Sequence, residues 1–171
     1  MKKIFIIIGI IIVIILYTST KVEAFRIPDE AIRLRVIGNS NSIMDQSTKM
    51  KVKEALETKV ALLLNNIDNV VEANRIIEEN LELFNKEVYK ILQDNNYRIN
   101  YGMNYFPQKE YKGITYDEGY YQSLVVTIGE GAGDNWWCVL FPPLCLLEAE
   151  ESTEVEYKFF VVELIEDIFN L

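Results

Sequence analysis

The two cysteines carry the clearest chemistry in this sequence. Cys138 and Cys145 flank a stretch that contains Pro142-Pro143. A continuous helix would hold their Cα atoms about 10.5 Å apart and a strand about 23 Å, whereas a disulfide requires less than about 7 Å. Because adjacent prolines interrupt a helix, a chain reversal is expected between the cysteines. The sequence leaves a disulfide and a pair of buried thiols open, and in both cases the two residues should lie close together.

Most other catalytic chemistry is excluded by composition. The chain contains no histidine, which removes Ser-His-Asp and Cys-His nucleophile pairs and imidazole metal sites. Gly129–Gly133 resembles a phosphate loop but lacks a following Lys-Ser/Thr, and Glu130 and Asp134 would repel phosphate. The same segment lacks the ligand alternation of a calcium loop. We therefore predict no catalytic residue, no metal site, no cofactor and no small-molecule substrate.

Both tryptophans lie in one dense apolar segment that begins at Asn135. Aromatic side chains serve cores and interfaces alike, and adjacent residues of a strand point to opposite faces. One of the two tryptophans is therefore expected near the surface, beside Gly129–Asn135, which we predict to be a mobile, exposed loop. Core packing is the alternative. The candidate partner-binding residues are Asn135, Trp136, Trp137, Phe141, Pro142 and Pro143.

The beginning of the chain has the pattern of an export signal. Two lysines precede an apolar run from Ile4 to Tyr17, the length of a signal-peptide core. Val22-Glu23-Ala24 has the spacing that signal peptidase recognises, so residues 1–24 would be removed and the mature protein would start at Phe25. The alternative is an uncleaved anchor formed by residues 4–20. Both alternatives place residues 25–171 across the membrane.

The exported part has the size of a single domain. The net charge of the chain is −9, which repels phosphate backbones, and the basic footprint of a nucleic-acid binder is missing. Acidic residues gather between Glu148 and Leu171, which suggests a face for a basic partner.

The expected fold class is α+β. Aliphatic residues alternate with arginines from Ile32 to Val36 and predict a strand. Helical spacing follows from Asp45 to about Asn65 and again from Asn69 to about Gln93. We thus predict a first strand, two amphipathic helices, an antiparallel sheet over residues 97–128 and a C-terminal helix within residues 157–170.

Three segments resemble the stage II sporulation protein R family. Residues 129–145 resemble its hallmark segment closely. A second match runs from Ile27 to Val36 and continues through Asn39-Ser40 and Asp45-Gln46 to Lys49–Lys53, and a weaker one covers residues 157–164. Ile37-Gly38-Asn39-Ser40-Asn41-Ser42 departs from the more usual Leu-Ala-Asn-Ser-Asp-Ser, so the acid of that loop is absent here.

The resemblance implies a signalling protein of endospore formation and not an enzyme. Such a protein would be made in the forespore and exported to the space between the forespore and mother-cell membranes. Its expected partner is a membrane-embedded aspartic protease, which it would activate to process pro-sigma-E. Two alternatives from other classes are an extracytoplasmic structural or envelope-binding protein and a carboxylate-dependent cell-wall hydrolase.

Overall fold

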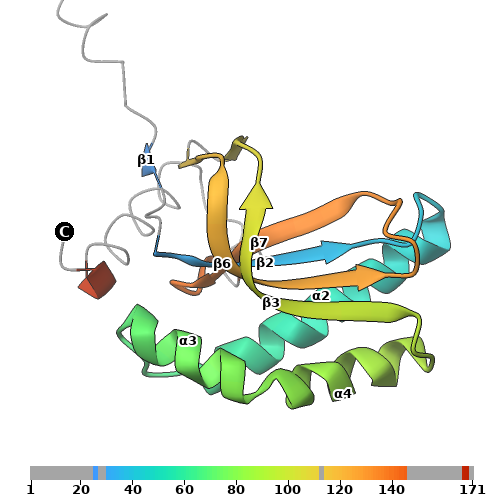
Figure 1. Cartoon of the computed structure of the whole chain (residues 1–171), viewed down its shortest axis with the longest axis horizontal. Coiled ribbons are helices and arrows are strands. Elements are labelled where there is room, and N and C mark those ends of the chain that lie inside the picture. The colour runs from blue at the N-terminus through green and yellow to red at the C-terminus, as the bar shows by residue number, and fades with distance from the viewer. Residues whose placement is uncertain (1–24, 27–29, 112–113, 146–166, 170–171) are drawn as a thin grey trace, which may run out of the picture.

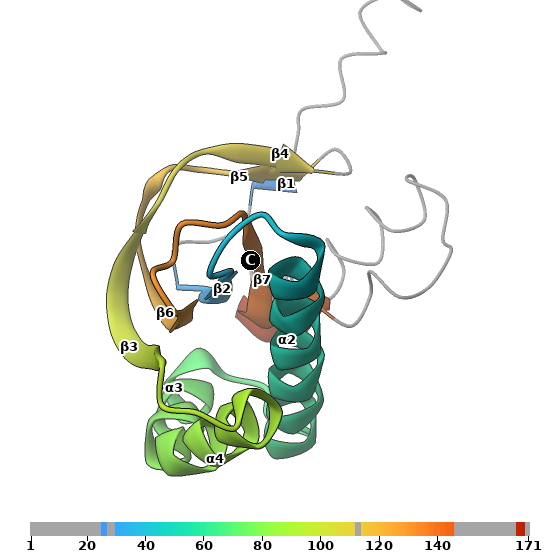
Figure 2. The same cartoon turned by 90° about the vertical axis from the view of Figure 1, so that its right-hand side faces the viewer.

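The computed structural model describes residues 25–26, 30–111, 114–145 and 167–169. Its centre is a four-stranded sheet in the order β3-β6-β2-β7. Helices α2, α3 and α4 cover one face of this sheet, and the small sheet β1-β5-β4 lies on the opposite side (Figures 1 and 2). The fold is α+β in a single domain, as predicted from the sequence.

Strand β2 (Ile32–Ile37) occupies an interior position in the sheet because both of its edges are hydrogen-bonded to other strands. Ile32, Leu34 and Val36 are fully buried on the helix side. On one edge β2 pairs in parallel with β6 (Gly119–Ile128), and on the other it pairs antiparallel with β7 (Asn135–Phe141).

The antiparallel sheet predicted over residues 97–128 is confirmed for β3 and β6, and the complete sheet is mixed because β2 pairs in parallel with β6. Strands β6 and β7 are consecutive in the chain and run in opposite directions. Because β2 lies between them, β2 must be parallel to one of the two and antiparallel to the other. The pairing of β3 (Tyr97–Phe106) with β6 is antiparallel, as expected for neighbouring strands. An insertion of this kind leaves no local signal in the sequence.

Helix α2 begins at Ile43, two residues before the predicted start at Asp45, and α3 begins directly after the predicted start at Asn69. In α2 (Ile43–Leu63) the Ser42 hydroxyl accepts from the Asp45 amide at 3.1 Å, and in α3 (Val70–Glu79) Asn69 accepts from the Glu72 amide at 2.8 Å. The predicted second helix ends at Asn80 and resumes as α4 (Leu81–Leu92). The Asn80 side chain donates to the Ile76 carbonyl at 2.8 Å, and such side-chain bonds compete with the continuing helix.

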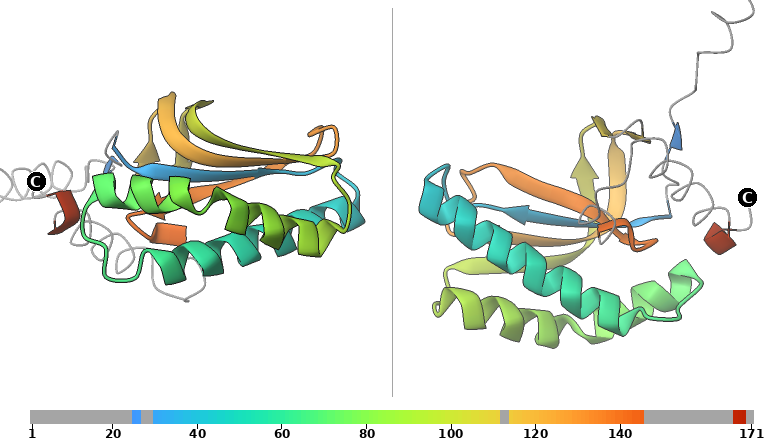
Figure 3. Two further views of the ribbon diagram at one scale, coloured as in Figure 1. Left: turned by 60° about the horizontal axis from the view of Figure 1, so that its bottom comes forward. Right: turned by 180° about the vertical axis from the view of Figure 1, so that it is seen from behind.

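The core lies between these helices and the sheet (Figure 3). The apolar face predicted for the second helix survives the break at Asn80, because Ile77, Phe84 and Val88 are all fully buried. Strands β4 (Lys109–Tyr111) and β5 (Ile114–Tyr116) lie between β3 and β6 in the chain. They pair antiparallel and form a second layer on the side of the four-stranded sheet that is opposite the helices. Short β1 (Phe25–Arg26) pairs in parallel with β5.

Two predicted segments lie largely outside the described residues. Of the predicted C-terminal helix, the structure describes residues 167–169, which are helical, and Ile168 packs against the core. The predicted export signal, residues 1–24, is not among the described residues. Among the helices that the structure describes, none has the length and apolar character needed to cross a bilayer.

Candidate functional site

The adjacent tryptophans of β7 point to opposite faces of the sheet, as the strand geometry predicted. Trp136 faces α2, where the Lys53 Nζ lies 4.6 Å from the centre of its ring. Trp137 faces the other side, where its ring meets that of Phe106 at a centroid distance of 5.7 Å. Both tryptophans are half-buried, so each has a packing role and a surface that solvent reaches.

Cations and aromatic rings alternate on the face that carries Trp137. The Arg33 guanidinium lies 3.3 Å from the centre of the Tyr121 ring, and that of Arg35 lies 4.1 Å from the centre of Phe106. The Lys109 ammonium lies 4.9 Å from the centre of the Trp137 ring. These distances are those of cation–π contacts.

Both arginines of this face keep their charge although they are sheltered from water. Arg33 is only 1% exposed. Burial lowers the pKa of Arg35 from its ordinary value, but a guanidinium stays protonated at physiological pH. The Arg35 guanidinium also donates to the Tyr105 carbonyl at 2.5 Å. The face therefore holds two guanidinium groups against aromatic rings.

A pocket of about 110 Å³ opens where this face meets β7. Because β7 is the last strand of the sheet, residues from both of its faces contribute to the walls. The pocket combines cationic, aromatic and amide groups, which suits an acidic or aromatic side chain of another molecule. We call it the aromatic pocket; its walls are Arg33, Lys109, Tyr116, Asn135, Trp136, Trp137 and Cys138.

The six predicted partner-binding residues divide between this pocket and the interior. Asn135, Trp136 and Trp137 line the pocket. Phe141 is 1% exposed and packs in the core, Pro142 is buried, and Pro143 is half-buried outside the pocket walls. Phe141 and Pro142 therefore have no surface to offer a partner.

Sequence reasoning missed the residues that β2, β4 and β5 bring to the pocket. Arg33 looked like the solvent face of a half-buried strand, and Lys109 and Tyr116 were not singled out within the sheet predicted over residues 97–128. The alternation of arginines with aliphatic residues was visible in the sequence. Which aromatic rings would cover the arginines was not visible, because the rings come from other strands.

The loop between β6 and β7, which composition predicted to be mobile and exposed, is partly exposed and is tied to the rest of the fold by hydrogen bonds. It crosses the end of β2 and is bonded to the loop that follows β2. The amides of Ala132 and Gly133 donate to the carbonyls of Asn39 and Gly38 at 3.1 and 2.9 Å. The Asp134 amide donates to the Asn41 side chain at 2.7 Å. We call the two segments, Gly38–Ser42 and Gly129–Asp134, the loop pair.

Close approach of the Asn39 side chain and of the Ser40 backbone explains two glycines of the loop pair. Gly129 has a φ of +55°, and a Cβ there would lie 2.1 Å from the Asn39 Oδ1. At Gly133 a Cβ would lie 2.4 Å from the Ser40 carbonyl oxygen. These glycines supply room and a left-handed turn, so they fix the loop instead of loosening it.

Side chains from the first turns of α2 complete the loop pair. Lys49 is 5% exposed and donates to the Gln46 Oε1 at 2.5 Å and to the Asp134 carbonyl at 3.2 Å. The carboxylate of Asp45 accepts from Ser40 and Asn39 at 2.5 and 3.0 Å, and these bonds lower the pKa of Asp45. The two stronger segments of the family resemblance thus meet at one end of the sheet.

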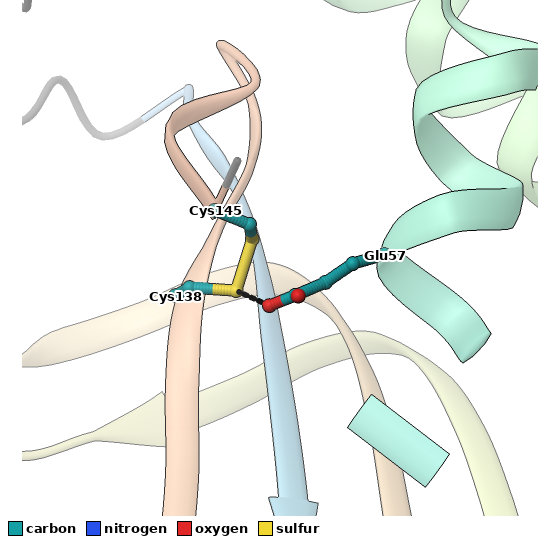
Figure 4. A group of neighbouring side chains, drawn as sticks. All are labelled: Glu57, Cys138 and Cys145. Carbon is teal, nitrogen blue, oxygen red and sulfur yellow. Dashed lines mark hydrogen bonds between the residues drawn. A yellow bond between two sulfur atoms is a disulfide. The ribbon is translucent and has the colours of Figure 1, made fainter. Parts of the chain in front are cut away.

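The cysteines are joined in a disulfide. The Cα atoms of Cys138 and Cys145 lie 5.4 Å apart, so the chain reverses between them as the proline pair suggested. The buried carboxylate of Glu57 on α2 approaches this bridge, with its Oε1 3.5 Å from the Cys138 Sγ (Figure 4). A disulfide sulfur carries no hydrogen, so this is a contact between oxygen and sulfur and not a hydrogen bond.

Comparison with known proteins gives the class to which this fold and site belong. Residues 28–151 match the family model of stage II sporulation protein R (spore_II_R), and the chain belongs to this family. The matched region contains the loop pair and the aromatic pocket. Membership of the family supports a role in sporulation.

One curated relative is similar along most of its length. It is the stage II sporulation protein R of Bacillus subtilis (strain 168), which is 31% identical over 189 aligned positions, with 84% of each chain covered. No solved structure shows significant similarity to this chain.

Proposed function

We propose that this protein is an exported signal of endospore formation that activates a membrane-embedded aspartic protease, which then processes pro-sigma-E in the mother cell. Family membership supports the sporulation role. The export pattern of residues 1–24 supports action in the space between the forespore and mother-cell membranes. The absence of histidine from the sequence supports a ligand over an enzyme.

The observation that carries this proposal is the aromatic pocket beside the loop pair. Large rings held at the surface by packing, with charged groups around them, are typical of residues that dominate binding energy. Trp137 is held in this way by Phe106, with Lys109 at the rim. The pocket would receive an acidic or aromatic side chain of the protease's exposed part, and the rigid loop pair would form the adjoining contact.

Reconstitution tests this proposal. Purified protein from Phe25 onward is added to membranes that contain the protease and its pro-sigma substrate, and cleavage of the substrate is followed over time. We expect cleavage that depends on the added protein and saturates with its concentration. Absence of cleavage with correctly folded protein would contradict the proposed function.

Charge reversal at the pocket rim tests the site within the same assay. Lys109→Glu should abolish or strongly reduce activation, because an exposed side chain of opposite charge would repel an acidic partner. Lys86→Glu, which makes the same change at an exposed position of α4, is the control. Thermal melts should show both variants folded. Equal activation by the two variants would exclude the pocket as the contact.

A further inference from the structure

Three groups that can bind a metal ion converge between α2 and β7. The Sγ atoms of Cys138 and Cys145 and a carboxylate oxygen of Glu57 lie within 4.8 Å of one another, and all three residues are buried (Figure 4). They come from two elements far apart in the sequence, α2 and the end of the sheet. The signalling role proposed above makes no use of Glu57.

We propose that the reduced form of this protein binds one Zn²⁺ ion through Cys138, Cys145 and Glu57. In a tetrahedral zinc site, thiolate sulfur and carboxylate oxygen lie about 3.6 Å apart, given the usual bond lengths. The Cys138 Sγ and the Glu57 Oε1 are already 3.5 Å apart. Opening the bridge requires the two sulfurs to separate to about 3.8 Å, which side-chain rotation achieves over a Cα separation of 5.4 Å.

The two oxygens of Glu57 divide their contacts in a way that suits a ligand. Oε1 faces the sulfur, whereas Oε2 accepts from the Lys53 Nζ at 2.9 Å. Lys53 in turn lies over the Trp136 ring. Outer partners of this kind orient metal ligands. Two thiolates and a carboxylate exceed the charge of Zn²⁺ by one, and the Lys53 ammonium offsets that excess.

The site borders a surface pocket, because Cys138 is one of the walls of the aromatic pocket. Three protein ligands leave one tetrahedral position open, which water occupies in zinc sites of this type.

Formation of the site proceeds in two balanced steps. A dithiol reductant transfers two electrons and two protons to the bridge; it becomes a disulfide itself, and Cys138 and Cys145 become thiols. Zn²⁺ then displaces one proton from each thiol and binds the two thiolates together with the Glu57 carboxylate. Oxidation of the cysteines would release the ion.

Cobalt substitution gives a direct test, because Co²⁺ bound by thiolates absorbs intensely in the near ultraviolet. The full exported domain is reduced with a phosphine under anaerobic conditions and titrated with Co²⁺. We expect a thiolate-to-cobalt band that saturates at one equivalent and disappears when Zn²⁺ is added. The oxidised protein should give no band. Failure of the reduced protein to give a band, or a band in the oxidised protein, would overturn the proposal.

Substitution of the carboxylate tests the third ligand. Glu57→Gln should weaken Co²⁺ binding by at least about tenfold, the loss usual even for outer partners of a metal ligand. Glu54→Gln, an exposed neighbour on α2, should bind as the wild type does. Circular dichroism of the reduced proteins establishes that each variant is folded. Equal affinity of a folded Glu57→Gln variant and the wild type would remove Glu57 from the site and overturn the three-ligand proposal.

Discussion

Gly129→Ala should destabilise the domain strongly although it adds only a single methyl group. The left-handed backbone at this position costs a residue with a side chain about 1 to 2 kcal/mol. The new Cβ would also lie 2.1 Å from the Asn39 Oδ1, so the Asn39 side chain has to move. It would then lose the bond at 3.1 Å that it accepts from the Glu130 amide, worth about 1 kcal/mol.

We therefore expect Gly129→Ala to lower the free energy of unfolding by about 2 to 3 kcal/mol. Urea denaturation of the exported domain, followed by tryptophan fluorescence, measures this difference. Ala132→Ser in the same loop is the control, because its side chain is exposed and the change should stay within about 0.5 kcal/mol.

The same experiment separates a fixed loop from a mobile one. A mobile loop would absorb the new methyl group by shifting, and Gly129→Ala would then behave like Ala132→Ser. A loss of stability below about 0.5 kcal/mol would therefore refute the reasoning from backbone approach. Such a small loss would indicate that this segment is flexible, as its composition predicts.

Further predictions concern charge, the disulfide and processing. Bonds from Ser40 and Asn39 lower the pKa of Asp45, so the stabilisation it provides is present above its unfolded-state pKa and is lost as pH falls through the folded-state pKa. In the Asp45→Asn variant the urea midpoint should therefore fall less steeply with decreasing pH than in the wild type. An equally steep fall in the two proteins would contradict this prediction. Replacing both Cys138 and Cys145 by serine should lower the free energy of unfolding by about 2 to 3 kcal/mol by the chain-entropy argument. A double variant as stable to denaturant as the oxidised wild type would contradict this prediction. N-terminal sequencing of secreted protein should begin at Phe25, whereas Met1 on membrane-bound protein would establish an anchor.

The fold was predictable wherever a local pattern determines the structure. Alternation identified β2, and the caps Ser42 and Asn69 stand where α2 and α3 begin. The break at Asn80 was missed because the apolar spacing continues across it. The parallel pairing of β2 with β6 could not be predicted, since it depends on where a distant strand is inserted.

The candidate site was predictable only in part for the same reason. The opposite orientation of Trp136 and Trp137 follows from strand geometry alone. The burial of Phe141 depends on its packing in the core, and the role of Arg33 depends on the rings of Phe106 and Tyr121. Composition could not assign the role of the glycines, since a glycine that permits contact and one that permits motion look alike in a sequence.

The position of β2 between β6 and β7 constrains the order in which this domain can be assembled. Arg33 pairs with Ser123 on one side and with Val139 on the other, so the two edges of β2 are satisfied by strands from the far end of the described chain. An emerging polypeptide therefore cannot complete its sheet until nearly all of the domain is available. Under the proposed export of this chain, late closure of the sheet favours folding after translocation and not before it.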